Sequence, residues 1–250
     1  MDLPRVVAPT LLALIACSGA ATAREVAVDR GPALGWTDTW RLANGEVEVV
    51  VVPQVGRIMR YARIGEANLL WANPPVLGKP LEAGQWTNYG GDKAWVWPQE
   101  DWIARTGVIW PPRFANELQP HTLDVVDGRI LRMTSPLIAE YGLRIVRDIT
   151  LAEAGSAVDI TTAFVQEKAG PDVAIGAWTI AQVPSDGTYF ARMVAADPPK
   201  ALYATWPTVR QLPPSMLELV PPPADAKLGL AADVLAYRRG DRLLLVARCD

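Results

Sequence analysis

Short segments in which apolar and polar residues alternate run through most of this chain, and pairs of turn residues separate them. Successive side chains of a strand point to opposite faces of a sheet, so a period of two predicts half-buried strands. The pairs Asn44-Gly45 and Asp127-Gly128 are typical of tight hairpin turns, because their residues tolerate positive φ. The hairpins predicted around them join residues 36–42 to 46–52 and residues 123–126 to 129–133.

Further strands are expected at residues 143–151, 157–166, 173–183, 189–194 and 242–247. No capped amphipathic segment of helical length is found, and 22 prolines along the chain disfavour long helices. Many short strands joined by turns are typical of a sandwich or a barrel. The sequence therefore predicts an all-β fold, and we expect an antiparallel β-sandwich.

Two stretches interrupt this pattern. Residues 73–119 are rich in Pro, Gly and Trp, and residues 197–223 carry eight prolines. A long irregular excursion inside a compact domain is usually functional or disordered, and the aromatic content of residues 73–119 argues against disorder. We expect both stretches to be irregular, the second covering one face or linking sheets.

The first residues predict export. A short segment with one positive charge, residues 1–5, precedes an apolar run at 6–16, which suits a signal peptide and is too short to span a bilayer. Ala21-Thr22-Ala23 is a possible cleavage site, which would define residues 1–23 as the signal peptide. The run that ends at Cys17 is similar to a bacterial lipobox, in which that cysteine is lipidated. A third interpretation is that Cys17 is only a small apolar residue of the signal core.

Charge and cysteine usage exclude several classes of function. With 24 basic and 27 acidic residues, a net charge of −3 gives no basic field for nucleic acid. The single histidine excludes a multi-histidine metal site, and no cofactor is predicted, although scattered carboxylates leave calcium open. Once Cys17 is removed or acylated, only Cys249 remains, so no internal disulfide is expected. A membrane contact is expected only through a lipid anchor.

The tryptophan-rich part of the excursion favours carbohydrate binding. Five of the ten tryptophans lie within residues 86–110 and alternate with amide and charged side chains. Aromatic faces stack on sugar rings while polar side chains bind hydroxyl groups, and Gly90-Gly91 would allow a close backbone approach. The alternative is that these tryptophans simply form a core around the excursion.

Several motifs resemble those of a known superfamily. Residues 51–61 and the run Asn68-Leu69-Leu70-Trp71 are similar to the opening strands of galactose mutarotase-like sandwiches. Residues 88–99 resemble a motif of one bacterial family of unknown function in that superfamily, and residues 178–182 resemble its later strand. The resemblance implies a single supersandwich domain over residues 31–250 whose concave face binds carbohydrate.

The chain departs from the mutarotase pattern in two respects. Mutarotases of this superfamily use a histidine pair and a glutamate, whereas His121 is the only histidine here. The sequence stops at Asp250, where further strands would be expected, so we expect a short or truncated member. Catalytic residues are therefore not identified, and Asp92, Lys93 and His121 are weak candidates. Asp92 and Lys93 could form an acid–base pair, bind ligand hydroxyls or form a structural ion pair. His121 would need a carboxylate partner such as Glu117 or Asp124.

The sequence predicts an exported envelope protein that binds carbohydrate, and it gives no indication of the oligomeric state. The alternatives are a sugar-modifying enzyme of epimerase or lyase type and a purely structural envelope lipoprotein. The residues expected to bind the sugar are Arg57, Trp86, Asn88, Asp92, Lys93, Trp95, Trp97, Gln99, Arg113, Arg144 and Trp178.

Overall fold

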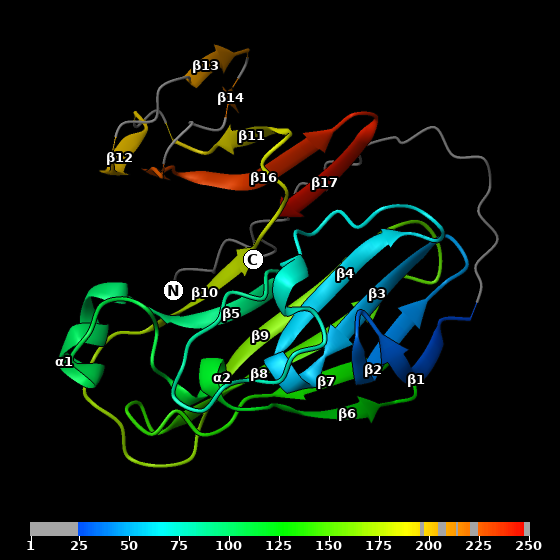
Figure 1. Cartoon of the computed structure of the whole chain (residues 1–250). Helices are drawn as coiled ribbons and strands as arrows, with labels where there is room; N and C mark the ends of the chain where they lie inside the picture. Colours follow the sequence, from blue (N-terminus) through cyan, green and yellow to red (C-terminus); the bar gives the residue numbers. More distant parts are fainter. Residues whose placement is uncertain (1–24, 196–197, 205–208, 214, 221–224, 248–250) are drawn as a thin grey trace, which may run out of the picture.

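The computed structural model describes residues 25–195, 198–204, 209–213, 215–220 and 225–247. The predicted signal segment 1–23 with Cys17, and also Cys249, lie outside these ranges. The described chain is mostly β, as predicted, and all of its paired strands run antiparallel (Figure 1).

Two sheets form the sandwich. The large sheet has the strand order β1 (Ala27–Ala33), β2 (Trp36–Ala43), β3 (Val47–Val52), β4 (Arg57–Arg63), β5 (Asp92–Trp97) and β10 (Gly176–Ala181). The small sheet has the order β6 (Thr122–Val126), β7 (Ile130–Thr134), β8 (Leu143–Leu151) and β9 (Val158–Gln166).

The remaining strands form a third layer. The C-terminal sheet has the order β13 (Val209–Leu212), β14 (Met216–Leu219), β11 (Thr188–Met193), β16 (Ala232–Arg239) and β17 (Arg242–Ala247). Two further strands form the β12–β15 pair, β12 (Lys200–Tyr203) and β15 (Lys227–Gly229). The helical elements are short: η1 (Pro53–Val55), η2 (Pro74–Val76), η3 (Gln99–Asp101), α1 (Trp102–Thr106) and α2 (Ala115–Leu118). Within the described residues, no helix has the length and apolar character needed to cross a membrane.

The core lies between the large and small sheets. Val49 and Val51 of β3 are completely buried in one cluster with Leu131 and Ile149 of the small sheet. All nine residues of β8 alternate between buried and half-buried, so one face of the strand is turned to the core. The alternation predicted for residues 143–151 is therefore confirmed.

Both predicted hairpins form, with different turns. Asp127 and Gly128 both have positive φ, at 50° and 71°, as a tight hairpin turn requires. In the other hairpin only Gly45 has positive φ, at 86°. Asn44 acts through its side chain, whose Nδ2 donates to the carbonyls of Ala152 at 2.8 Å and of a nearby glycine at 2.9 Å. This asparagine therefore ties its turn to the loop that joins β8 and β9.

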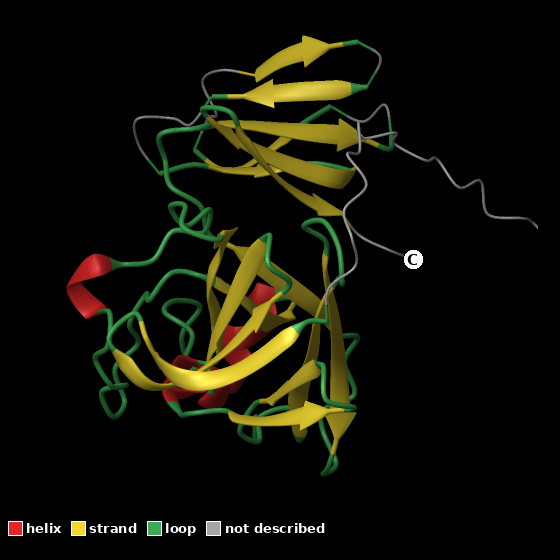
Figure 2. Cartoon of the chain, turned by 90° about the vertical axis from the view of Figure 1, so that its right-hand side faces the viewer, coloured by secondary structure: helices red, strands yellow, loops and turns green. Residues whose placement is uncertain are grey.

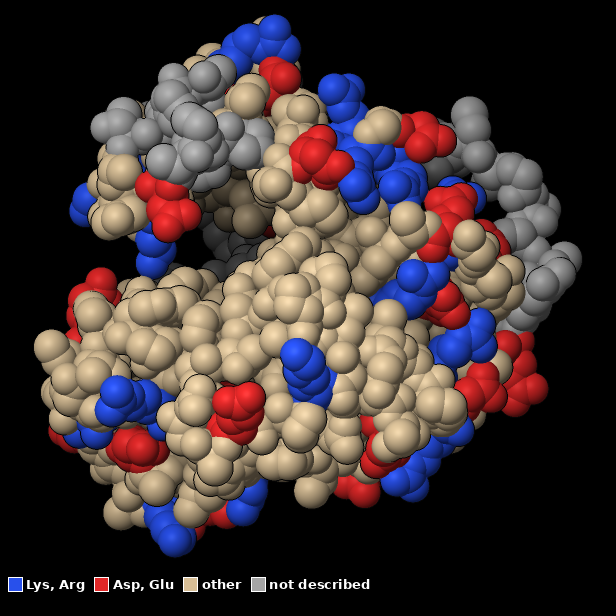
Figure 3. Space-filling model, in the orientation of Figure 1, with Lys and Arg blue, Asp and Glu red and all other residues tan. Residues whose placement is uncertain are grey.

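The C-terminal sheet lies as a separate layer above the sandwich (Figure 2). Tyr237 of β16 and Leu244 of β17 belong to the same buried cluster as the sandwich core, so the two layers touch there. Away from that contact the surface is hollowed between the β12–β15 pair and the β5–β10 ladder (Figure 3).

The prediction that residues 197–223 are irregular was wrong in part. The strands β12, β13 and β14 lie in this stretch. Each of these strands has only four residues, and prolines separate it in sequence from the strands with which it pairs. Segments this short give no alternation from which a strand could be predicted. β16 was also not predicted. The earlier stretch 73–119 is largely irregular but contains β5, which pairs with the distant β10.

Candidate functional site

A single carboxylate, that of Glu117 on α2, lies at the centre of the predicted site. Its Oε2 accepts hydrogen bonds from Arg57 Nη2 at 2.8 Å and from Trp86 Nε1 at 2.7 Å. Its Oε1 accepts the indole N–H of Trp95 at 2.7 Å, and the ammonium of Lys93 lies 3.4 Å from Oε2. Because one carboxylate has about four acceptor positions, Glu117 can hold all four donors and fix the orientation of both indoles.

Burial and charge oppose each other in this cluster. Burial raises the pKa of Glu117, but the charges of Arg57 and Lys93 and the indole hydrogen bonds outweigh it and hold that pKa below its usual value. Burial lowers the pKa of Lys93 to about 7, against the opposing charge of Glu117. The side chains of Lys93 and Glu117 are only 4% and 3% exposed, so these groups are sealed from solvent. The ammonium also lies 4.1 Å from the centre of the Trp95 ring.

His121 lies beside this cluster without bonding to it. Burial lowers its pKa to about 4 although the charge of Glu117 opposes the shift, so the imidazole is neutral at neutral pH. Its ring lies against Gly56, where any larger side chain would overlap it. Within the described chain its buried Nδ1 has no hydrogen-bond partner, and neither Glu117 nor Asp124 bonds to it. The carboxylate partner that catalysis by His121 would need is thus not in place.

Asp92 and Lys93 point to opposite faces of β5. The carboxylate of Asp92 pairs with the guanidinium of Arg147 on β8, across the inside of the sandwich. Lys93 faces outward, towards Glu117. The acid–base pair considered from the sequence does not form, because neighbours on a strand alternate in direction. Asp92 forms a structural ion pair between the sheets.

Trp95 is the centre of an aromatic wall on the outer face of β5 and β10. Its ring centre lies 5.2 Å from those of Trp102 and Trp178, and 6.0 Å from that of Trp110, all edge to face. Trp86 meets Trp110 in the same geometry at 4.8 Å. Trp95 is 5% exposed whereas Trp110 is 51% exposed, so the wall runs from the core to the surface.

The open end of this wall lies at Trp97. This residue is 53% exposed and shares the outer face of β5 with Trp95. Gln99 follows it, and the ammonium of Lys227 from the β12–β15 pair lies 3.4 Å from Gln99 Oε1 and 4.7 Å from the centre of the Trp178 ring. These four side chains we call the Trp97 platform: Trp97, Gln99, Trp178 and Lys227. The contact of Lys227 places the β12–β15 pair over the β5–β10 ladder, beside the hollow of Figure 3.

The other predicted residues lie apart from the platform. Asn88 is structural, since its Oδ1 accepts the N–H of Gly90 at 3.2 Å and its carbonyl accepts Asn73 Nδ2 at 2.8 Å. Arg144 lies on the outer face of the small sheet, where it bonds Glu167 at 2.7 Å. Arg113 is exposed on the excursion. Of the predicted residues, the structure brings Arg57, Trp86, Lys93 and Trp95 together around Glu117, and Trp97, Gln99 and Trp178 at the platform.

The pair Gly90-Gly91 serves the fold. A side chain at Gly90 would overlap the carbonyl of Trp71, and one at Gly91 would overlap the carbonyl of Ile58. Both glycines have positive φ, at 88° and 74°. The close approach predicted here is therefore to the protein's own backbone.

Sequence reasoning missed Glu117 as the central residue and Lys227 as part of the platform. Glu117 was noted only as a neighbour of His121, and four helical residues give no periodic signal of burial. Lys227 lies 128 residues from the glutamine that it contacts, so only the tertiary fold could reveal it.

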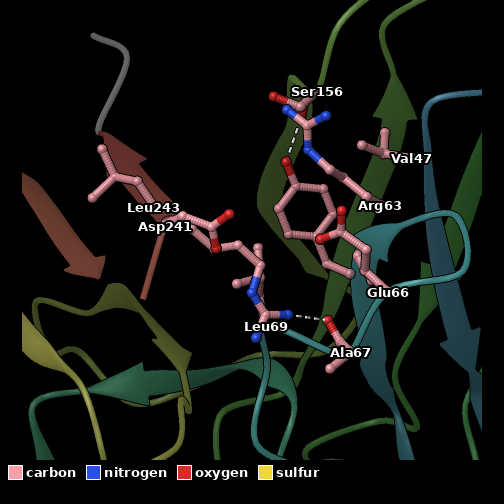
Figure 4. A pocket seen from close by; sticks show the side chains of 11 residues that line it. Val47, Arg63, Glu66, Ala67, Leu69, Ser156, Asp241 and Leu243 are labelled. Carbon is pink, nitrogen blue, oxygen red and sulfur yellow. Dashed lines mark hydrogen bonds between the residues drawn. The ribbon is translucent and has the colours of Figure 1, made fainter. Parts of the chain in front are cut away.

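A cleft of about 460 Å³ lies elsewhere, where β4 meets the β16–β17 hairpin (Figure 4). Arg63 and Glu66 line one side, and Asp241 and Leu243 line the other. Arg242 Nη1 donates to the carbonyl of Ala67 at 2.8 Å, so the cleft marks the contact between the C-terminal sheet and the sandwich. None of the predicted sugar-binding residues lines it.

No metal centre is found in the part of the chain that the structure describes, where no three His, Cys, Asp or Glu side chains gather. Comparison with protein-family models, with curated proteins and with solved structures found no match to this chain.

Proposed function

We propose that this chain is an exported carbohydrate-binding protein of the cell envelope and that its sugar site is the Trp97 platform. The observation that carries the proposal is the half-exposed indole of Trp97, which lies two residues before Gln99 on the strand face that it shares with Trp95. The cross-strand partner of Trp95 is Trp178, and Lys227 contacts both Gln99 and Trp178. The resemblance to galactose mutarotase-like sandwiches is part of the same proposal.

The platform has the two properties that a sugar ring requires. An exposed indole offers a flat apolar face for the C–H groups of a pyranose, while amide and ammonium groups beside it bind hydroxyls. Trp97 is carried on β5, next to the buried Trp95 that Glu117 holds in place. A stacking face on such a support loses little conformational freedom when a ligand binds.

The platform is only part of the set expected from the sequence. Arg57, Lys93 and Trp95 are buried and support the wall, so in the proposal they do not touch the ligand. The sugar instead lies over Trp97, towards the β12–β15 pair and the half-exposed Trp110.

Tryptophan fluorescence of the mature protein tests the proposal against a panel of mono- and oligosaccharides. A ligand that stacks on Trp97 changes the emission in a saturable way, and calorimetry with the same ligand gives its affinity. An unchanged spectrum with no measurable heat across the panel would refute carbohydrate binding.

Export is a separate part of the proposal. If Cys17 is lipidated, the protein labels with a palmitate analogue and fractionates with membranes, and Cys17→Ser abolishes both properties. An unmodified N-terminus at Arg24 would show that cleavage follows Ala23 and that no lipid anchor forms.

A sugar-modifying enzyme is the second candidate, and one observation favours it. Lys93 has a pKa lowered to about 7 beside Glu117, as a proton-transferring lysine would need. Because both side chains are sealed, this role requires an opening that admits substrate. Product analysis with the sugar panel distinguishes it: conversion by the wild type that Lys93→Met abolishes, with sugar affinity retained, would favour the enzyme.

A further inference from the structure

We infer that the sugar recognised at the Trp97 platform is acidic, bearing a carboxylate as a uronic acid does, and that Lys227 contacts this group. The inference rests on the proposed function, because it names the chemical class of ligand for the same site.

The first observation is the electrostatic setting of Lys227. Its ammonium lies 3.4 Å from the neutral Oε1 of Gln99 and over the ring of Trp178, and it forms no ion pair within the described residues. Exposed Lys79 and Lys168 also form no ion pair within the described residues, but Lys227 differs from them in its contact with an aromatic ring. Lys227 therefore brings a positive charge to the platform that no described carboxylate neutralises.

The second observation is the donor capacity that remains at this site. An ammonium has three N–H donors, and one long bond to an amide oxygen leaves the others available. The Nε2 of Gln99 already donates to the carbonyl of Ile109 at 3.2 Å, which holds the amide with its oxygen towards Lys227. The geometry thus leaves an ammonium donor for an incoming group, and an anion is the partner that gains most from it.

The third observation is the aromatic surround of this charge. Tyr203 is the cross-strand partner of Lys227 in the β12–β15 pair, so the two side chains share one face, and Tyr203 is 63% exposed. With Trp178 beneath the ammonium, aromatic surface flanks the charge. Lys227 is itself exposed, so its charge is open to an incoming ligand.

Two acidic residues of the described chain are close to this site in sequence. Glu100 and Asp225 are close to Gln99 and Lys227 in sequence and are exposed, but neither lies within ion-pair distance of the ammonium. A ligand carboxylate at Lys227 therefore displaces no existing ion pair.

Calorimetry with matched ligands tests this inference. Trisaccharides of galacturonate, glucuronate and mannuronate are each compared with their own methyl esters, which keep the sugar ring and remove the charge. We expect one free acid to bind about 3- to 10-fold more tightly than its ester at low salt, and this preference to shrink as salt is added.

Variants then assign the preference to Lys227. Lys227→Gln should bind acid and ester alike, Lys227→Arg should keep the preference, and neither should change the melting temperature. Arg129→Gln removes one exposed charge from the distant β6–β7 turn and should leave the preference intact. Equal affinity of acid and ester for the wild type, or a preference that persists in Lys227→Gln, would overturn the inference while leaving carbohydrate binding standing. Preference for a sulfated neutral trisaccharide over every uronate would also overturn it. Absence of binding by all ligands would refute the proposed function, and the inference with it.

Discussion

Trp95 donates its indole N–H to Glu117 at 2.7 Å, and this bond joins the buried ion cluster to the aromatic wall. On one side Glu117 holds Arg57 and Lys93, and on the other Trp95 supports the rings that lead to the surface. The buried charged groups therefore hold in place the aromatic residues that support the proposed site. Their removal is expected to act on stability first and on ligand binding second.

Glu117→Gln should destabilise the fold strongly. The substitution keeps the shape of the side chain but leaves two buried cations without their carboxylate, which typically costs about 3–5 kcal/mol. Because Lys93 can release its proton readily, we expect a value near the lower end of that range. Chemical denaturation measures the change in the free energy of unfolding.

Glu100→Gln is the matched control, because Glu100 is exposed on η3. This substitution should change the free energy of unfolding by less than about 0.5 kcal/mol. A Glu117→Gln protein as stable as the control would contradict a supporting role for this cluster.

The titration of His121 should be strongly displaced in the folded protein. It is the only histidine, so its ring protons can be followed by NMR without ambiguity. Burial lowers its pKa to about 4, against an unfolded value of about 6.5. The unfolded state then binds more protons than the folded state below pH 6.5, so this residue's contribution to stability is lost as the pH falls towards 4. A midpoint near 6.5 would show that the ring is solvated.

Burial of Lys93 should make the free energy of unfolding depend on pH in the alkaline range. Its folded pKa of about 7 lies below the unfolded value of 10.5, so the unfolded state binds more protons between these values. The free energy of unfolding should therefore rise with pH from about 7 to 10 through this group, and Lys93→Met should remove that part of the slope. If the free energy of unfolding changes with pH equally in the wild type and in Lys93→Met over this range, the burial of a titrating lysine is contradicted.

The sequence was informative wherever structure is local. The turn at Asp127 and the alternation of residues 143–151 depend on neighbours within a few positions, and both were predicted correctly. β5 was missed because its partner β10 lies some 80 residues further along the chain. The strands β12 to β14 were missed because each has only four residues in a proline-rich stretch, although β13 and β14 pair locally with each other.

The candidate site was only partly predictable. Composition identified the tryptophan-rich segment, but it could not tell the buried Trp95 from the exposed Trp97, although they are two positions apart on one face of β5. The difference arises because Trp102, Trp110 and Trp178 surround the first ring, and these residues come from other elements. The tertiary fold therefore decides which tryptophan is exposed for a ligand and which is buried as its support.

The affinity of Trp97→Ala for the best-binding glycan tests most directly whether this platform holds the sugar. Removing an exposed stacking face should weaken binding about 3- to 10-fold with little change in melting temperature. Trp95→Ala is the matched variant on the same strand face, and it should destabilise the fold by about 3–5 kcal/mol because its ring is buried. Unchanged glycan affinity in a stably folded Trp97→Ala protein would contradict the proposed site.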